Sequence, residues 1–173
     1  IEDFVPETSL EKAQDIVFRA YSVMGRKQIH MARKALQVDP NCADAYILLA
    51  ERTPLQDKQL EYYTQALRAA ERTLAPEVFE KDAGHFWEVV ETRPYMRARF
   101  RLAEHLNTMN RLQEAAEHFR ELLRLNSQDN MSARFWFWPC LLRLGKDKEV
   151  EQLLKQSRSD RGDCTWDYTR ALL

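Results

Sequence analysis

Apolar side chains recur along this chain at the spacing of amphipathic helices. Over residues 112–123 they follow the i, i+3, i+4, i+7 pattern of a helix that buries one face. Residues 100–106 have a similar apolar face, and the polar stretch 107–110 separates the two segments. The apolar positions are Phe100, Leu102, Ala103, Leu106, Leu112, Ala115, Ala116, Phe119, Leu122 and Leu123. This pattern predicts two helices joined by a short turn.

The same hairpin recurs on both sides of this unit. About 35 positions further on, Phe137 stands in place of Leu102 and Gly145 in place of Asn110, where a glycine ends helices well. Two earlier copies lie upstream, and the first of them ends in the helix-stopping sequence 38–40. We therefore predict an all-α superhelix, a solenoid of about four helical hairpins, at residues 9–39, 42–73, 95–126 and 130–157, followed by a terminal helix at 163–173.

One segment, residues 74–94, interrupts the period between the second and third hairpins. Proline and glycine punctuate it, yet Phe79, Phe86 and Trp87 make it more apolar than a linker. We expect this insertion to form irregular or short helical structure that packs its aromatic side chains against the repeats. Insertions in solenoids tend to fall on one face, which is often the binding face.

Composition narrows the class of protein. With 173 residues, 4 Gly, 6 Pro and 45% apolar residues, the chain suits one domain spanning 1–173 and excludes a collagen-like or Gly/Pro-rich disordered chain. A net charge of −1 gives no overall basic field for nucleic acid or an anionic membrane. The longest uncharged apolar run, 135–142, is too short to span a bilayer, and the first residues lack the features of a signal peptide. Three cysteines favour a reduced compartment, so we expect a soluble cytoplasmic protein without membrane contact.

Two features of the hairpins resemble the tetratricopeptide repeat (TPR). Leu102-Ala103 followed by Leu106, with Ala115 and Phe119 in the second helix, resembles the TPR pattern, and so does Gly145 at its turn. Other positions depart from the pattern, because Arg99 stands where the TPR family favours Trp and Ser127 where it favours Pro. The resemblance covers nearly the whole chain and implies a TPR-like solenoid.

A closer likeness lies in three stretches, 41–51, 84–99 and 123–130. They resemble cytoplasmic bacterial TPR proteins related to the suppressor-of-tumorigenicity protein seven family. Met131-Ser132 stands where this likeness leads us to expect Gln-Gly, so we expect a different local turn there. The resemblance implies a cytoplasmic interaction protein with no established chemistry, and it supplies no catalytic residue to transfer.

In the TPR arrangement, the first helix of each hairpin lines a concave groove in which a peptide can dock. By this register the groove-facing residues are Asp44, Ile47 and Glu51 in the second hairpin; Arg97, Phe100, Glu104 and Asn107 in the third; and Phe135, Pro139 and Leu142 in the fourth. We add Trp87 and Arg93 from the insertion and Trp136 as candidate partner-binding residues. The hypothesis is a groove bounded by the third and fourth hairpins and the insertion.

The aromatic run 135–138 leaves two interpretations open. Consecutive helical residues point about 100° apart, so four aromatic side chains in a row cannot all enter one core. Either Phe137 and Trp138 are core while Trp136 packs on the preceding hairpin, or one aromatic side chain is an exposed anchor for a partner. Pro139 removes a backbone donor and is expected to kink the helix.

Arg93, Arg97 and Arg101 share one face of a predicted helix, with Arg99 and Arg134 expected nearby. Such a cluster can grip carboxylates or phosphates, including those of RNA, through bidentate hydrogen bonds. It can equally pair within the protein, and the expected partners are Glu88, Glu91 and Glu104.

Signals of catalysis and metal binding are weak in this sequence. The four histidines, His30, His85, His105 and His118, have no metal-ligand spacing, and no phosphate-binding or nucleophile motif occurs. We therefore expect no catalysis, no metal and no cofactor, and a scaffold that binds a protein or peptide partner. Three alternatives stay open: an RNA-binding helical repeat, a module of a larger enzyme, and association between copies through the terminal helix.

Overall fold

The computed structural model describes residues 8–156, 169 and 171. Over these residues the chain forms nine α-helices and one short 3-10 helix, and it contains no β-strand. The prediction of an all-α helical-repeat superhelix is therefore confirmed. The predicted terminal helix at 163–173 lies outside the described residues, apart from positions 169 and 171.

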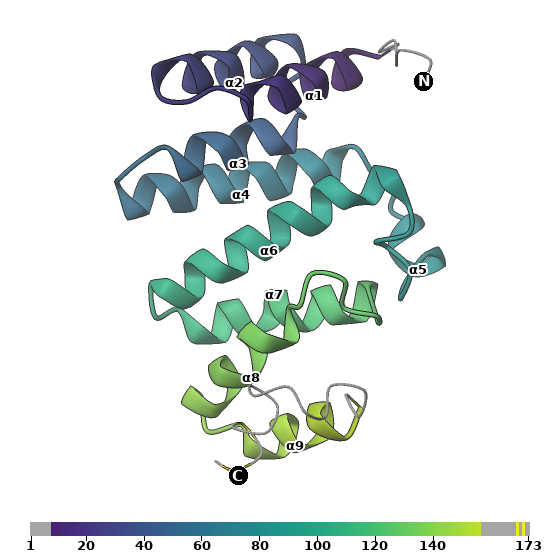
Figure 1. Cartoon of the computed structure of the whole chain (residues 1–173). Helices are drawn as coiled ribbons and strands as arrows, with labels where there is room; N and C mark the ends of the chain where they lie inside the picture. Colours follow the sequence, from purple (N-terminus) through teal and green to yellow (C-terminus); the bar gives the residue numbers. More distant parts are fainter. Residues whose placement is uncertain (1–7, 157–168, 170, 172–173) are drawn as a thin grey trace.

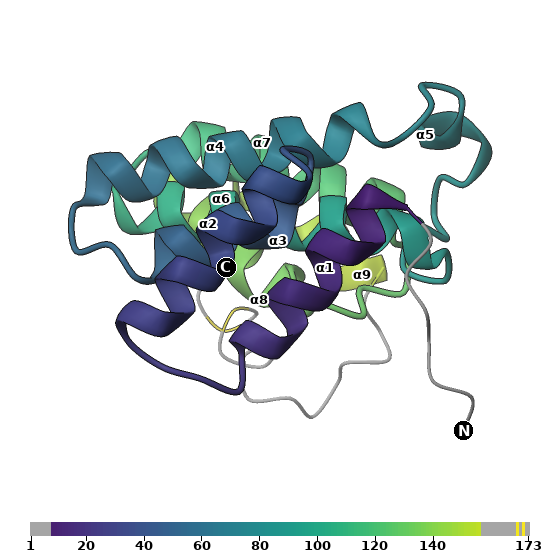
Figure 2. The same ribbon diagram turned by 90° about the horizontal axis from the view of Figure 1, so that it is seen from above.

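Eight of the helices in this described part pair into hairpins that stack on one another (Figure 1). The pairs are α1 (Ser9–Ala20) with α2 (Arg26–Val38), α3 (Ala43–Glu51) with α4 (Gln56–Arg72), α6 (Arg93–Thr108) with α7 (Leu112–Leu125), and α8 (Arg134–Arg143) with α9 (Asp147–Gln156). Between hairpins, α2 packs on α3, α4 on α6 and α7 on α8. Seen from above, α4 and α7 lie on one side of the stack, whereas α1 and α8 lie on the other (Figure 2).

Two of the turns within hairpins have the same geometry, 35 positions apart. Asn110 and Gly145 both have a left-handed backbone, with φ of 61° and 66°. In each turn a backbone N–H reaches back to a carbonyl five residues earlier, from Arg111 to Leu106 and from Lys146 to Leu141, both at 2.9 Å. This is the Schellman ending of a helix, and it places Gly145 at the turn, as the sequence predicted.

The turn that precedes α8 is built differently. Asp129 and Ser132 have positive φ angles of 51° and 58°, although neither is a glycine. The Asp129 carboxylate accepts hydrogen bonds from the backbone N–H groups of Ala133 (2.7 Å) and Arg134 (3.0 Å), and so satisfies donors at the start of α8. Ser132 thus holds a backbone conformation that favours glycine, at the position where the family resemblance led us to expect one.

Small apolar residues let the stacked helices approach closely. Fully buried alanines occur in six helices: Ala13 and Ala20 in α1, Ala32 and Ala35 in α2, Ala66 and Ala69 in α4, Ala98 and Ala103 in α6, and Ala115 and Ala116 in α7, with Ala45 and Ala50 in α3. The largest core cluster runs from α3 to α9 and takes in the insertion. Each hairpin therefore completes the core of its neighbour, as expected for stacked repeats.

The insertion packs against the repeats, as predicted. It contains α5 (Val78–Lys81) and the 3-10 helix η1 (Val90–Thr92). Phe86 is fully buried, and its ring meets those of Phe79 and Tyr95 at centroid distances of 5.4 and 5.9 Å. Its backbone N–H donates to the carbonyl of Leu125 at 2.9 Å, which ties the insertion to the end of α7.

Two members of the aromatic run are buried and one is exposed. Phe137 and Trp138 are buried, whereas Trp136 is 40% exposed. The ring of Phe135 packs edge-on against Trp138 at 5.3 Å. Pro139 lies on the exposed side of α8, and the helix continues beyond it to Arg143.

Candidate functional site

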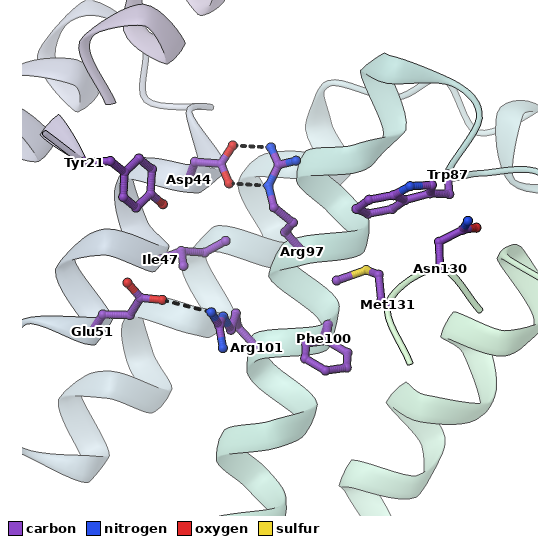
Figure 3. Close-up of a pocket in the computed structure, with 10 residues that line it drawn as sticks. All are labelled: Tyr21, Asp44, Ile47, Glu51, Trp87, Arg97, Phe100, Arg101, Asn130 and Met131. Carbon is purple, nitrogen blue, oxygen red and sulfur yellow. Dashed lines mark hydrogen bonds and ion pairs between the residues drawn. The ribbon is translucent and has the colours of Figure 1, made fainter. Parts of the chain in front are cut away.

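A cavity of about 440 Å³ opens where α1, α3 and α6 meet the insertion and the loop before α8. Figure 3 shows the side chains that surround it. They are Tyr21, Asp44, Ile47, Glu51, Trp87, Arg97, Phe100, Arg101, Asn130 and Met131. The end of α1, the insertion, α6 and the loop before α8 therefore converge with α3 on one concave site.

A bidentate ion pair joins two of the helices around the cavity. Arg97 of α6 donates from Nε to Asp44 Oδ1 at 2.8 Å and from an Nη to Oδ2 at 2.5 Å (Figure 3). The Asp44 side chain is only 4% exposed, whereas that of Arg97 is 37% exposed. Gln14 of α1 donates to the same Oδ2 at 2.8 Å. Because Asp44 lies on α3, its carboxylate links the first three hairpins.

Arg101, about one turn further along α6, contacts two carboxylates at once. It donates to Glu104 at 2.8 Å and lies 3.5 Å from a carboxylate oxygen of Glu51 on α3. These three side chains are between 20% and 46% exposed, so they form the solvent-facing edge of the charged wall.

Tyr21 faces this wall from the end of α1 (Figure 3). Tyr21 is half-exposed, and partial burial of its phenol, followed by the carboxylates of Asp44 and Glu51, raises its pKa to about 12. The phenol therefore keeps its proton at neutral pH and can donate a hydrogen bond to a bound group.

The opposite wall is apolar and consists mainly of Trp87, Phe100 and Met131 (Figure 3). Arg93 positions Trp87, because its Nε donates to the Trp87 carbonyl at 2.9 Å and its guanidinium lies 5.5 Å from the centre of the Trp87 ring. Phe100 packs edge-on against the buried Phe119 at 6.3 Å. Aromatic side chains held this way can receive an apolar group with little loss of side-chain freedom.

The structure brings seven of the residues named from sequence to the cavity: Asp44, Ile47, Glu51, Trp87, Arg97, Phe100 and Arg101. Glu104 lies next to the cavity, where it pairs with Arg101, and the guanidinium of Arg93 packs against the ring of Trp87. Asn107 lies further along α6, where it accepts a hydrogen bond from Arg143 at 3.1 Å. Phe135, Trp136, Pro139 and Leu142 of α8 do not line the cavity. The site therefore lies nearer the first hairpin than the groove predicted from sequence.

Sequence reasoning missed three of the lining residues, Tyr21, Asn130 and Met131. Tyr21 follows Gln14 by seven positions, two turns along the same face of α1, and this register could have revealed it. Asn130 and Met131 precede α8 in a loop, and helical periodicity gives no signal for a loop.

The other arginines of the predicted cluster are engaged within the protein. Arg99 lies 3.8 Å from Glu71 and 3.3 Å from His118, and Arg134 pairs with Asp129 at 2.9 Å. Of the expected partners, Glu104 pairs with an arginine, whereas Glu88 contacts His85. The cluster thus serves several separate contacts between segments of the fold.

The side chains of the cavity are charged, aromatic or apolar, apart from the amide of Asn130. Its lining, as far as the structure describes the chain, contains no Ser, Thr, Cys or His side chain. Over the same residues, no group of three or more His, Cys, Asp or Glu side chains gathers as a metal site. Nor is any described helix both long enough and apolar enough to cross a bilayer. What the site offers is one charged wall, one apolar wall and a protonated phenol.

Comparisons with known proteins give a family. A search of curated proteins and a search of solved structures each returned no match. The family model described as ST7 protein matches residues 4–156, in line with the resemblance seen in the sequence. This match covers well over half of the chain, and the chain therefore belongs to the ST7 protein family.

Proposed function

We propose that this protein is a non-catalytic, TPR-like scaffold of the cytoplasm that binds a segment of a partner protein in the concave cavity between α1, α3 and α6. The observation that carries the proposal is the cavity itself, in which aromatic and charged side chains from separate hairpins converge. Binding energy usually concentrates where aromatic residues and arginine are held in place by the packing behind them. Here Phe119 supports Phe100, Arg93 supports Trp87 and Asp44 supports Arg97.

RNA binding by the arginine cluster is the less favoured alternative. Recognition of phosphates needs guanidinium groups that are free to neutralise them. In this fold Arg97, Arg99, Arg101 and Arg134 each contact a carboxylate of the protein. A phosphate would have to compete with those carboxylates.

The test is selection of peptides from a random twelve-residue library displayed on phage, with the folded protein immobilised. Peptides recovered on the unmodified chain are then measured against two variants. The first is the double variant Tyr21→Ala, Met131→Ala, which removes one side chain from each of two opposite sides of the cavity. Both side chains are at least partly exposed. Leu55→Ser is the control, because Leu55 is apolar and 67% exposed but lies away from the cavity.

We expect the selected peptides to bind the Leu55→Ser protein as they bind the unmodified chain. The cavity variant should bind them at least about tenfold more weakly, since each lost contact of this kind is worth about 1 kcal/mol or more. Circular dichroism checks that all three proteins are folded. Equal binding by the cavity variant, or failure to recover any peptide, would contradict the proposal.

A further inference from the structure

The charged wall of the cavity, taken together with Glu104, which pairs with Arg101 just outside the lining, has an excess of carboxylates. Three carboxylates, those of Asp44, Glu51 and Glu104, face the two guanidinium groups of Arg97 and Arg101. Asp44 and Arg97 compensate each other in a bidentate pair. Arg101 is shared between Glu51 and Glu104, so one negative charge is left over at the solvent-facing edge.

The electrostatic environment of Tyr21 agrees with this excess of negative charge. After burial, the carboxylates of Asp44 and Glu51 are the main causes that raise the pKa of its phenol, and they outweigh Arg97 and Arg101, which lower it. Arg93, the other arginine near the site, is not part of the lining, because its guanidinium packs against the Trp87 ring.

An apolar ledge adjoins this acidic edge. Phe18 in the last turn of α1 is followed at three-residue spacing by Tyr21 and Met24 in the turn after the helix, and the three are 77%, 54% and 78% exposed. Phe18 lies four positions after Gln14, which bonds Asp44, and three before Tyr21, which lines the cavity. Helical geometry therefore places Phe18 on the same face of α1 as these two. Exposed aromatic rings next to excess negative charge suit a cation, which gains from both.

We propose that the segment bound in the cavity carries a Lys or Arg side chain next to a large apolar one. The cation lies at the edge formed by Glu51 and Glu104, beside Tyr21, and the apolar side chain packs between Trp87, Phe100 and Met131. This inference rests on the proposed function, because it names the class of peptide that the same cavity takes. An acidic segment is disfavoured, since both arginines of the lining already hold carboxylates of the protein.

The experiment uses the same random twelve-residue phage library and the full chain. The readout is the number of Lys and Arg relative to Asp and Glu in the recovered peptides, together with their affinities as synthetic peptides at two salt concentrations. Glu51→Gln with Glu104→Gln removes the two edge charges and keeps side-chain size. Glu114→Gln is the matched control, because Glu114 also pairs with an arginine, Arg111, but lies on α7 outside the cavity lining.

We expect basic and apolar residues to be enriched next to each other in the recovered peptides. The double variant should bind them about two- to tenfold more weakly, as removal of partly exposed charge pairs predicts, and the Glu114→Gln control should bind unchanged. Higher salt should weaken binding to the unmodified chain more than binding to the double variant.

Recovery of acidic peptides, or equal binding by the double variant, would overturn the inference about charge while the cavity remains a peptide site. Loss of binding in the Tyr21 and Met131 variant together with unchanged binding in the glutamine variant identifies that case. Failure of the unmodified chain to select any peptide would instead overturn the proposed function and this inference with it.

Discussion

The pair formed by Asp44 and Arg97 gives the sharpest test of how this fold is held together around the cavity. The carboxylate is 4% exposed and accepts three hydrogen bonds, two from Arg97 and one from Gln14. Replacement by Asn removes the charge and turns one acceptor into a donor that faces the guanidinium. Breaking a fully buried pair costs about 3–5 kcal/mol. Because Arg97 is 37% exposed and water can reach it, we expect Asp44→Asn to lower the free energy of unfolding by about 2–3 kcal/mol.

A double-mutant cycle isolates the pair from the other effects of each substitution. The four proteins are the unmodified chain, Asp44→Asn, Arg97→Met and the double variant, unfolded in urea and followed by far-ultraviolet circular dichroism. We expect a coupling energy of about 1.5–2 kcal/mol, and a fall in Tm of about 5–10 °C for Asp44→Asn alone. Moderate salt should leave most of the coupling, since a buried charge is weakly screened.

The pair of Arg111 and Glu114 is the control, because it has the same bidentate geometry, with both contacts at 2.6 Å, but lies in solvent. Its cycle should give a coupling within experimental error, in line with other exposed pairs. A coupling below about 0.5 kcal/mol for Asp44 and Arg97 would refute the reasoning, because burial would then add nothing to the same hydrogen-bond geometry.

Three further predictions concern packing, turn geometry and pH. Phe86→Ala should lower the free energy of unfolding by about 3–5 kcal/mol, because it opens a cavity under the insertion. Phe18→Ala, at an exposed position, should change it by less than about 0.5 kcal/mol, and urea unfolding of both variants tests the difference. Ser132→Gly should raise the free energy of unfolding by about 0.5–1 kcal/mol, because glycine adopts the φ of 58° at this position without strain. Gly145→Ser should lower it by about 1 kcal/mol; the added Cβ meets no atom within 4 Å, so the cost comes from the positive φ alone. Thermal scans in which both variants shift Tm in the same direction would contradict this. Burial, followed by the Arg99 charge, lowers the pKa of His118 to about 4 in the folded protein. Below about pH 6.5 the imidazole therefore binds a proton in the unfolded chain but not in the folded one, and the free energy of unfolding falls as the pH drops. Between pH 7.5 and 5 the loss should be about 2 kcal/mol larger than in His118→Gln, and equal losses in both proteins would contradict the assignment.

Local features of the sequence determined the helices and their turns. Apolar residues at i, i+3, i+4 and i+7 define a buried face within a single helix, so the pattern in 112–123 is sufficient to predict α7. The equivalence of Asn110 and Gly145 was visible for the same reason, because a helix ending depends on a few consecutive residues. The family could also be recognised from short stretches of residues.

Tertiary structure alone decided the location and character of the site. Asp44 and Arg97 are 53 positions apart, and no periodicity within either helix indicates that they meet. Glu88 was an equally good partner for an arginine by composition, yet it contacts His85. The docking of the insertion on α7 brings Trp87 to the cavity, and the loop before α8 brings Met131. Which side chains converge depends on how successive hairpins are rotated against each other, and that rotation is set by packing between distant segments.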